Sequence, residues 1–443
     1  MNGTGEIDAT PSKRFFIQML IRDIGLQEAI LDLIDNAVHG VILRTGVDVM
    51  GILAGRAPSK RISGTIDIDI RPTRFTIQDT CGGISIDDAK HEVFRFGKPG
   101  PNGDGKGLGV YGIGMKRAFF KIGNRTAVES RTTQEEFAVD INAKEWLAEP
   151  DNWTFAFRYA RPLRSRLEVG KAGTTITITE LHENTRRLLE GRTFEELLRK
   201  KIAKVYQLFL GRGLVIRVNS TPVEAEARLE ELATSREIGA ARQSSRYQRV
   251  TVLIIAGVAP RADRTPRGWY VFCNGRMVLE ADQTATTGWG NGLPAWNPKY
   301  NHFLGLLLFG SGHVEDLPWK TSKDGVEYEA PVYQYALGQM RTLCRPILEF
   351  LGRAYPDQPE ESVPEREVLE RAATVSGARV ARGADRAFRV KVPKTSETRT
   401  VNIQYVRPKA DVVRIAESLG RPRLAAGRVG EFTFDYYLRN VCK

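Results

Sequence analysis

Apolar and polar positions separate cleanly in residues 28–40, which read Glu-Ala-Ile-Leu-Asp-Leu-Ile-Asp-Asn-Ala-Val-His-Gly. Wound as a helix, this stretch gathers its apolar residues on one side, where they would dock to a core. Glu28, Asp32 and Asn36 fall on the opposite stripe at i, i+4 spacing, with Asp35 one step aside. Like charges at this spacing repel each other. A cation against the stripe would relieve the repulsion, so the helix is a candidate ligand site.

Alternation with a period of two predicts strands around this helix. The run 65–70 alternates isoleucine with threonine and aspartate, and 75–77 reads as its hairpin partner. Together with helical segments in 15–50, these runs predict an α+β sandwich, a mixed sheet with helices on one face. Further strands of the same sheet are expected at 127–139, 153–159 and 174–179.

The rest of the chain predicts a second, strand-rich domain and a small last module. Residues 269–278 read as two strands joined by an Asn-Gly turn, and 222–248 as a charged surface insertion. Further expected helices are 193–210, 329–351, 410–419 and 431–441, and further expected strands are 214–218, 250–255, 303–309 and a hairpin of 388–392 with 400–406. The predicted domains are 1–185 and 186–352, followed by a Pro-containing and acidic linker, 353–385, and a basic α+β module, 386–443.

Composition narrows the class of protein. The 443 residues contain no apolar run of the 18 residues that a membrane span needs, so no membrane segment is expected. Four widely separated cysteines argue against a structural zinc and predict a reducing, cytoplasmic location. The net charge is +12, and residues 371–443 hold 16 Lys and Arg against 6 Asp and Glu. This excess predicts attraction to duplex DNA or another polyanion.

A carboxylate stands at the end of the predicted 65–77 hairpin. Asp79 is followed by Thr-Cys-Gly-Gly, so the chain turns on Gly82 and Gly83 directly after the strand. A carboxylate fixed there can accept a hydrogen bond from a planar amino group such as that of adenine. The glycines let the backbone approach a flat ring closely.

A second glycine-rich segment, 103–114, leads into the helix-like residues 115–122. A glycine loop feeding a helix N-terminus is a site for anions, because backbone N–H groups and the helix dipole both favour negative charge. Lys116 and Arg117 add positive charge in the first turn, where the dipole alone disfavours it, and this indicates a phosphate. The segment fits neither the P-loop nor the dinucleotide fingerprint.

In order and spacing, these motifs resemble the Bergerat-fold (GHKL) ATPases, which include DNA gyrase, heat-shock-90 chaperones, sensor histidine kinases, MutL and MORC proteins. The first motif of that superfamily is an acidic residue four positions before Asn, here Asp32 and Asn36. The others are Asp-x-Gly-x-Gly at 79–83, where Cys81 replaces the first glycine, a lid ending in Gly-x-x-Gly-x-Gly at 109–114, and Gly-Thr opening the strand at 173–179. The layout is closest to MORC and MutL proteins, whose second domain is a ribosomal-S5-like transducer.

The resemblance implies a role for each motif. Asn36 would coordinate Mg²⁺ on the phosphates of ATP, Asp79 would bind the adenine amino group, and Asp32 would be the general base. The remaining nucleotide-binding residues would be Gly83, Ile84, the lid residues Gly109, Val110, Tyr111, Gly112, Ile113 and Gly114, together with Lys116 and Thr174.

Two assignments stay open at the level of sequence. The base is usually Glu in these families, and Asp32 is one methylene shorter, so Glu28 is a competing candidate. The transducer lysine that reaches the γ-phosphate would be Lys323, beside Asp324-Gly325, or else Lys320.

The function expected from the resemblance is a Mg²⁺-dependent ATPase, a slow switch that dimerises or closes on ATP and acts on a partner in a DNA-linked process. The alternative is a non-hydrolysing nucleotide-binding scaffold or a chaperone-like protein. A histidine kinase is disfavoured, because it needs a phospho-accepting helical hairpin before the nucleotide motifs. The first motif begins near residue 28, which leaves too little room for that hairpin.

Overall fold

The structure is a computed structural model that describes residues 11–46, 62–97, 108, 112–225, 231–262, 266–356, 363–392 and 403–442. The chain divides into two compact units, 1–392 and 393–443. In the described part of the chain, no helix combines the length and apolar character that crossing a membrane requires.

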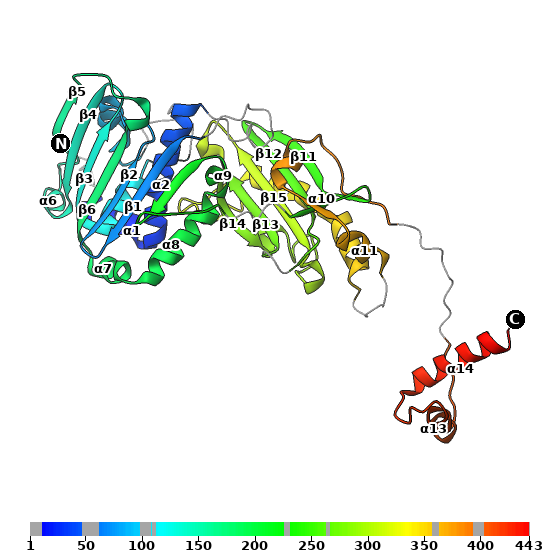
Figure 1. Ribbon diagram of the computed structural model, residues 1–443. Helices are drawn as coiled ribbons and strands as arrows, with labels where there is room; N and C mark the ends of the chain where they lie inside the picture. Colours follow the sequence, from blue (N-terminus) through cyan, green and yellow to red (C-terminus); the bar gives the residue numbers. More distant parts are fainter. Residues whose placement is uncertain are drawn as a thin grey trace, which may run out of the picture. The chain divides into compact units, whose positions relative to one another are not determined.

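The first sheet of the larger unit has eight strands in the order β5-β4-β3-β6-β2-β1-β7-β8 (Figure 1). It is mixed, because β1 and β7 are parallel while the other neighbours are antiparallel. The strands are β1 (Gly64–Arg71), β2 (Arg74–Asp79), β3 (Gly123–Arg131), β4 (Glu135–Asn142), β5 (Phe157–Pro162), β6 (Gly173–Leu181), β7 (Leu214–Val218) and β8 (Thr221–Pro222).

Helices cover one face of this sheet. Alternate residues of β1, Ile66, Ile68 and Ile70, are buried beneath them, while Asp67 and Asp69 are half-buried on the other face. The helices of this part are α1 (Lys13–Arg22), α2 (Leu26–Thr45), α4 (Ile86–Asp88), the π-helix η1 (Ala89–Val93), α5 (Gly114–Ile122), α6 (Ala143–Ala148), the 3₁₀ turn η2 (Val169–Lys171) and α7 (Glu183–Glu190). The mixed sheet with its helices fits the Bergerat fold expected from the sequence.

A second sheet of five strands has the order β11-β12-β15-β13-β14. All eight residues of β15 are buried, because α10 lies on one face of the sheet and the segment around β9 and α12 lies on the other. The elements are α8 (Arg192–Val205), α9 (Gln207–Leu210), β11 (Ala241–Tyr247), β12 (Val250–Val258), β13 (Gly268–Cys273), β14 (Arg276–Asp282), β15 (Phe303–Gly310), α10 (Pro331–Ala354), and the 3₁₀ turns η3 (Ala285–Thr287), η4 (Pro298–Tyr300) and η5 (Val314–Asp316).

A third, small sheet in the order β16-β9-β10-β17 shows where two sequence expectations differ from the structure. Residues 222–248, expected to be a surface insertion, contain three strands, and the expected linker contains α11, β16 and α12. Residues 389–390 pair with β10, and 403–406 contain no strand, so the expected hairpin is not seen in the described residues. The elements are β9 (Leu232–Thr234), β10 (Ile238–Gly239), α11 (Pro364–Glu370), β16 (Ala373–Val375), α12 (Gly377–Ala381) and β17 (Arg389–Val390).

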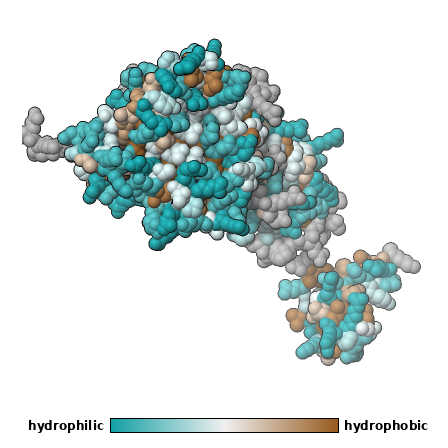
Figure 2. Space-filling view, turned by 60° about the vertical axis from the view of Figure 1, so that its left-hand side comes forward, coloured by the Kyte–Doolittle hydropathy of each residue, from teal (hydrophilic) through white to brown (hydrophobic). Residues whose placement is uncertain are grey.

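The smaller unit contains two helices, α13 (Lys409–Ser418) and α14 (Ala426–Asn440). Ala416 and Val429 are its buried hydrophobic side chains among the described residues. Phe434 and Tyr436 of α14 are more than half exposed, and hydrophobic residues are visible on the surface of this unit in Figure 2. Of the expected α+β module, residues 403–442 therefore contain helices and no strand, while 389–390 form β17 of the larger unit.

Candidate functional site

Helix α2 holds candidate residues both in the buried interior and at the surface. Asp32 and Asp35 are 2% and 0% exposed, whereas Asn36 is exposed. The helix ends at Thr45, where Gly46 takes the left-handed conformation (φ 58°) that closes many helices. One helix thus holds two buried carboxylates beside one accessible amide.

Asp32 lies between cations from two different elements. Its Oδ2 forms an ion pair with Nε of Arg117 from α5, and Nζ of Lys323 lies 3.7 Å from its Oδ1. Arg117 also donates to the carbonyl of Thr321 at 3.2 Å, in the same loop as Lys323. A Cβ added at Gly114 would lie 3.2 Å from Cγ of Asp32, so the first turn of α5 packs directly against this carboxylate.

Asp35 is the centre of a second set of contacts. Nζ of Lys323 donates to its Oδ2 at 2.7 Å, and Nε of Arg276 lies 2.9 and 3.1 Å from its two oxygens. The hydroxyl of Tyr206 donates to Oδ1 at 2.6 Å. Burial alone would raise the pKa of Asp35, but the charges of Arg276 and Lys323 outweigh burial and hold the pKa below its usual value.

The charges in this buried cluster do not balance. The described residues contribute two carboxylates, Asp32 and Asp35, and three cations, Arg117, Arg276 and Lys323, each at most 6% exposed. An uncompensated charge in a protein interior is costly. An anion bound at this point would balance the surplus cation.

The N-terminus of α5 is the natural place for such an anion. Its N-cap residue, Ile113, makes no side-chain hydrogen bond to the helix, and Gly112 has a positive φ of 61°. Gly112, Ile113 and Gly114 are described, whereas Gly109, Val110 and Tyr111 and residues 103–107 of the expected lid lie outside the described residues.

Lys116 was expected to face a phosphate, and the structure places it differently. Its side chain is buried, and Nζ donates to the carbonyl of Val93 at 2.7 Å. Burial lowers the pKa of Lys116 to about 7. In this structure the cationic side chains next to Asp32 are therefore those of Arg117 and Lys323.

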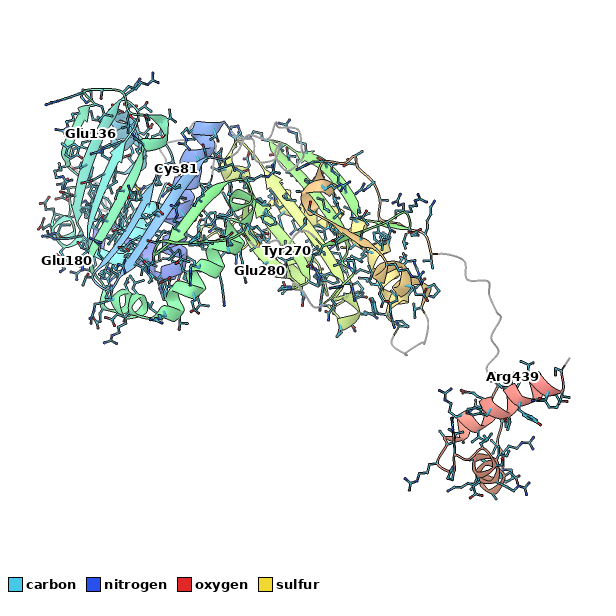
Figure 3. All side chains as sticks on the ribbon, viewed as in Figure 1. Cys81, Glu136, Glu180, Tyr270, Glu280 and Arg439 are labelled. Atoms are coloured by element: carbon cyan, nitrogen blue, oxygen red, sulfur yellow. The ribbon has the colours of Figure 1, made fainter. Side chains whose placement is uncertain are left out.

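Asp79 ends β2 and is half-buried. Burial raises its pKa to about 6, although hydrogen bonds from the backbone of Cys81 and Thr174 oppose the shift. The N–H of Cys81 donates to Oδ1 of Asp79 at 2.7 Å, and Cys81 itself is buried beside Gly40 of α2 (Figure 3). The turn thus accommodates a cysteine where related motifs have glycine.

Ser130 joins the remaining two motif residues at this end of the sheet. Its hydroxyl lies 2.9 Å from that of Thr174 and accepts the N–H of Ile84 at 2.7 Å. Asp79, Ile84 and Thr174, which come from two separate motifs, are therefore brought together where β2 and β6 pair.

Two glycines allow the backbones to meet here. A Cβ at Gly83, which has φ 72°, would overlap the carbonyl of Arg131, and a Cβ at Gly173 would overlap the carbonyl of Asp79.

We expect Gly173→Ala to lower the free energy of unfolding by about 2–4 kcal/mol, since neither backbone can move without breaking the sheet. Urea unfolding checks this value. Gly170→Ala is the matched control, because a Cβ at that position meets no atom within 4 Å. Equal stability of the two variants would contradict the close approach at Gly173.

The alternative candidates for the general base and for the transducer lysine lie outside the buried cluster. Glu28 is engaged in an ion pair with Lys201 of α8, and Lys320 is exposed. Lys323 is 6% exposed and has a positive φ of 56°, which is uncommon for a residue with a side chain. The structure therefore brings Asp32 and Lys323 together, and places Glu28 and Lys320 in other surroundings.

Arg276 and Tyr206 belong to the cluster but were not among the expected site residues. A sequence signal for Arg276 exists: it is a charged residue directly before the apolar run Met277-Val278-Leu279 and directly after the Asn274-Gly275 turn. Tyr206 has no comparable signal.

Comparison with known proteins agrees with this geometry over part of the chain. Residues 24–155 match a family described as histidine kinase-, DNA gyrase B-, and HSP90-like ATPases. No curated protein matches the chain. The matched segment contains α2, Asp79 and the start of α5, and it ends before Thr174 and Lys323. Residues 24–155 are thus similar to a GHKL-type ATPase domain, a match that supports ATP binding by this part of the chain.

Proposed function

We propose that the protein is a Mg²⁺-dependent ATPase that works as a slow molecular switch. The surplus cation in the buried cluster of Asp32, Asp35, Arg117, Arg276 and Lys323 is the observation that carries this proposal. The cluster lies against the first turn of α5, where backbone N–H groups favour a phosphate. A triphosphate would supply the missing negative charge.

The residues that surround this cluster fit a nucleotide and its metal. Asn36 is accessible and offers an amide oxygen, and Mg²⁺ binds few protein ligands when phosphate oxygens complete its shell. Asp79, with Thr174 and Ile84 beside it, offers a half-buried acceptor for the adenine amino group. The lid, 103–114, would close over the phosphates through its backbone amides. When bound, Mg²⁺ supplies charge stabilisation to the phosphates.

Asp32 and Lys323 are assigned to the reaction itself. Asp32 would orient the attacking water and accept its proton, and Lys323 would stabilise charge on the terminal phosphate. Both side chains are buried within 3.7 Å of each other. In this proposal the second domain is a transducer, because it delivers Lys323 from the loop between η5 and α10.

The pKa of Asp79 leads to a pH dependence of nucleotide binding. The ionised carboxylate is a stronger acceptor for the adenine amino group than the protonated acid, and the pKa of about 6 in the free protein means that Asp79 is largely protonated at pH 5. We expect the Kd for ADP to rise by roughly tenfold between pH 7 and pH 5, since binding must then release a proton. Titration calorimetry in two buffers of different ionisation enthalpy measures both the Kd for ADP and the number of protons released on binding.

The matched variant for this measurement is Asp79→Asn, which also corrects for titration of the phosphates. It should bind ADP weakly, and its Kd should change with pH only as far as ADP itself does. The same pH dependence in both variants would contradict the role of Asp79.

Phosphate release tests the proposed activity. We expect slow turnover of ATP that is lost in EDTA and restored by Mg²⁺, and formation of a homodimer with a non-hydrolysable analogue in analytical ultracentrifugation. ATP binding without phosphate release would instead favour a nucleotide-binding scaffold. Turnover by a strictly monomeric protein would contradict the dimerising switch.

A link to DNA is supported by the excess of 16 basic over 6 acidic residues in 371–443. Binding through phosphate contacts weakens steeply with salt. Fluorescence anisotropy with duplex DNA should show binding at 50 mM salt, a large loss at 200 mM, and weaker binding by the double variant Arg421→Glu, Arg423→Glu. Absence of binding at low salt would contradict the link.

A further inference from the structure

Arg276 connects the first and the second sheet of the larger unit at the cluster. It is the first residue of β14, it follows the Asn274-Gly275 turn, and it is 3% exposed. Its Nε contacts both oxygens of Asp35 at 2.9 and 3.1 Å, while an NH1 hydrogen donates to the carbonyl of Lys323 at 2.5 Å. One guanidinium therefore contacts α2, which lies against the first sheet, and the loop that carries Lys323.

The turn that carries Arg276 is itself anchored. Backbone N–H of Asn274 donates to the carbonyl of Phe309, and its side chain exchanges two hydrogen bonds with Ser311, at 2.9 and 3.0 Å. Because Phe309 lies in β15, the position of Arg276 is determined by the buried centre of the second sheet, which Tyr270 marks in Figure 3.

The chemistry of the guanidinium suits this double contact. Its donors point in fixed directions in one plane, so it can hold a carboxylate and a carbonyl at the same time. A lysine ammonium at the same position could pair with Asp35 but has no rigid second arm for the carbonyl of Lys323. Arg276 touches the backbone of residue 323, so it acts on the direction of that lysine side chain.

We propose that Arg276 is a positioning residue that ties the Lys323 loop to Asp35 of α2, so that hydrolysis, and not nucleotide binding, depends on the seating of the second sheet against the ATP-binding helix. The inference rests on the proposed function for its effect on hydrolysis, whereas the tie between the loop and α2 can be tested without nucleotide.

The kinetic test compares Arg276→Met and Arg276→Lys with the wild-type protein. We expect both variants to lose roughly tenfold to a hundredfold in kcat, because a shift of about one ångström in a catalytic group is enough for such a loss. In Arg276→Lys, which keeps the charge of the cluster, the Kd for a non-hydrolysable ATP analogue with Mg²⁺ should change by less than about threefold. Arg276→Lys should recover the melting temperature of the wild type more closely than Arg276→Met but should not recover kcat. A kcat that follows the melting temperature in both variants would overturn the positioning role.

Arg242→Met is the matched control. Arg242 is also a buried arginine of the second domain, and it pairs with Asp385 and the carbonyl of Ala381, neither of which belongs to the cluster. This variant should lose stability with no change in kcat at a temperature where it is folded. A loss of kcat equal to that of Arg276→Met would show that general weakening of the second domain explains the effect.

Hydrogen exchange of the nucleotide-free protein tests the tie between the Lys323 loop and α2 independently of ATPase activity. The N–H of Lys323 donates to the carbonyl of Lys320, and the N–H of Lys320 to that of Gly325. These amides should exchange at least about tenfold faster in both Arg276 variants and at the wild-type rate in Arg242→Met. Unchanged exchange in the Arg276 variants would overturn the inference, even if the protein is an active ATPase. Faster exchange in these variants of a protein without ATPase activity would support the tie between the loop and α2 and contradict the proposed function.

Discussion

Replacing Asp32 by Asn should abolish ATP hydrolysis while leaving ATP binding in place. A positioned general base contributes about 10²- to 10⁴-fold to such a reaction, and the amide cannot accept the proton. The side chain of Asp32 lies beside Arg117 and Lys323, where a water and the terminal phosphate would meet. We expect phosphate release to fall by at least about a hundredfold and the Kd for the non-hydrolysable analogue to stay within about threefold of wild type.

Glu28→Gln is the matched control for Asp32→Asn. Glu28 lies one turn earlier on the same helix, but its ion pair with Lys201 holds it on α8, so this variant should retain turnover. Melting temperatures must accompany the rates, because removing one partner of a buried ion pair costs about 3–5 kcal/mol. An active Asp32→Asn together with an inactive Glu28→Gln would move the base to Glu28.

Replacing Lys323 by Met is the second change with a large expected effect. The methionine keeps most of the length of the side chain but removes the charge that would stabilise the terminal phosphate in the transition state. Charge stabilisation of this kind is worth about 10²- to 10³-fold in rate when a single donor is removed. We therefore expect kcat to fall by roughly a hundredfold, with a smaller change in the Kd of the analogue.

Lys320→Met is the control for a general effect of replacing a lysine in this loop. Lys320 is three residues away in the same loop and is exposed, so its loss should leave kcat within about twofold of wild type. Nζ of Lys323 also donates a buried hydrogen bond to Asp35, so Lys323→Met should lower the melting temperature while Lys320→Met should not. A larger loss of kcat in Lys320→Met than in Lys323→Met would reverse the assignment of the lysine.

The local elements of this protein could be predicted because their signals are local. The helix 28–40 lies inside α2, and the Asn274-Gly275 turn joins β13 and β14 as the sequence predicts. The apolar side of α2 and the alternation in β1 each follow from a periodicity of a few residues. The same is true of the order of the glycine motifs, which led to the fold expected for the first 180 residues.

The buried ion cluster could be predicted only in part. Asp32 and Asp35 stood out as a costly pair of carboxylates on one helix, but their partners Arg276 and Lys323 lie 241 and 288 positions away from Asp35. Contacts at such separation depend on how the two sheets are seated, which no local pattern encodes. For Lys116, the local pattern and the structure differ. The glycine-rich loop before it predicted that this side chain binds a phosphate, but the side chain is buried and its Nζ donates to a backbone carbonyl.

The segments 222–248 and 353–385 were not expected to contain strands, for a related reason. β9, β10 and β16 have two or three residues each, too few for an alternating pattern to be recognised, and β11 is mostly polar. They are held by pairing across long distances in the chain, with Val375 opposite Leu232 and Val390 opposite Ile238. Charge and proline content in these segments favoured a loop, and tertiary pairing overrode it.

The central claim is that ATP and Mg²⁺ bind between α2 and the glycine-rich segment before α5. Titration calorimetry of the folded wild-type protein with ATP at millimolar Mg²⁺ tests it most directly, with Asn36→Ala as the paired variant. The account predicts saturable binding that weakens strongly when Mg²⁺ is chelated, and a variant that loses this Mg²⁺-dependent part. Absence of any heat of binding for the wild-type protein at several temperatures, or an unchanged Mg²⁺ dependence in Asn36→Ala, would contradict it.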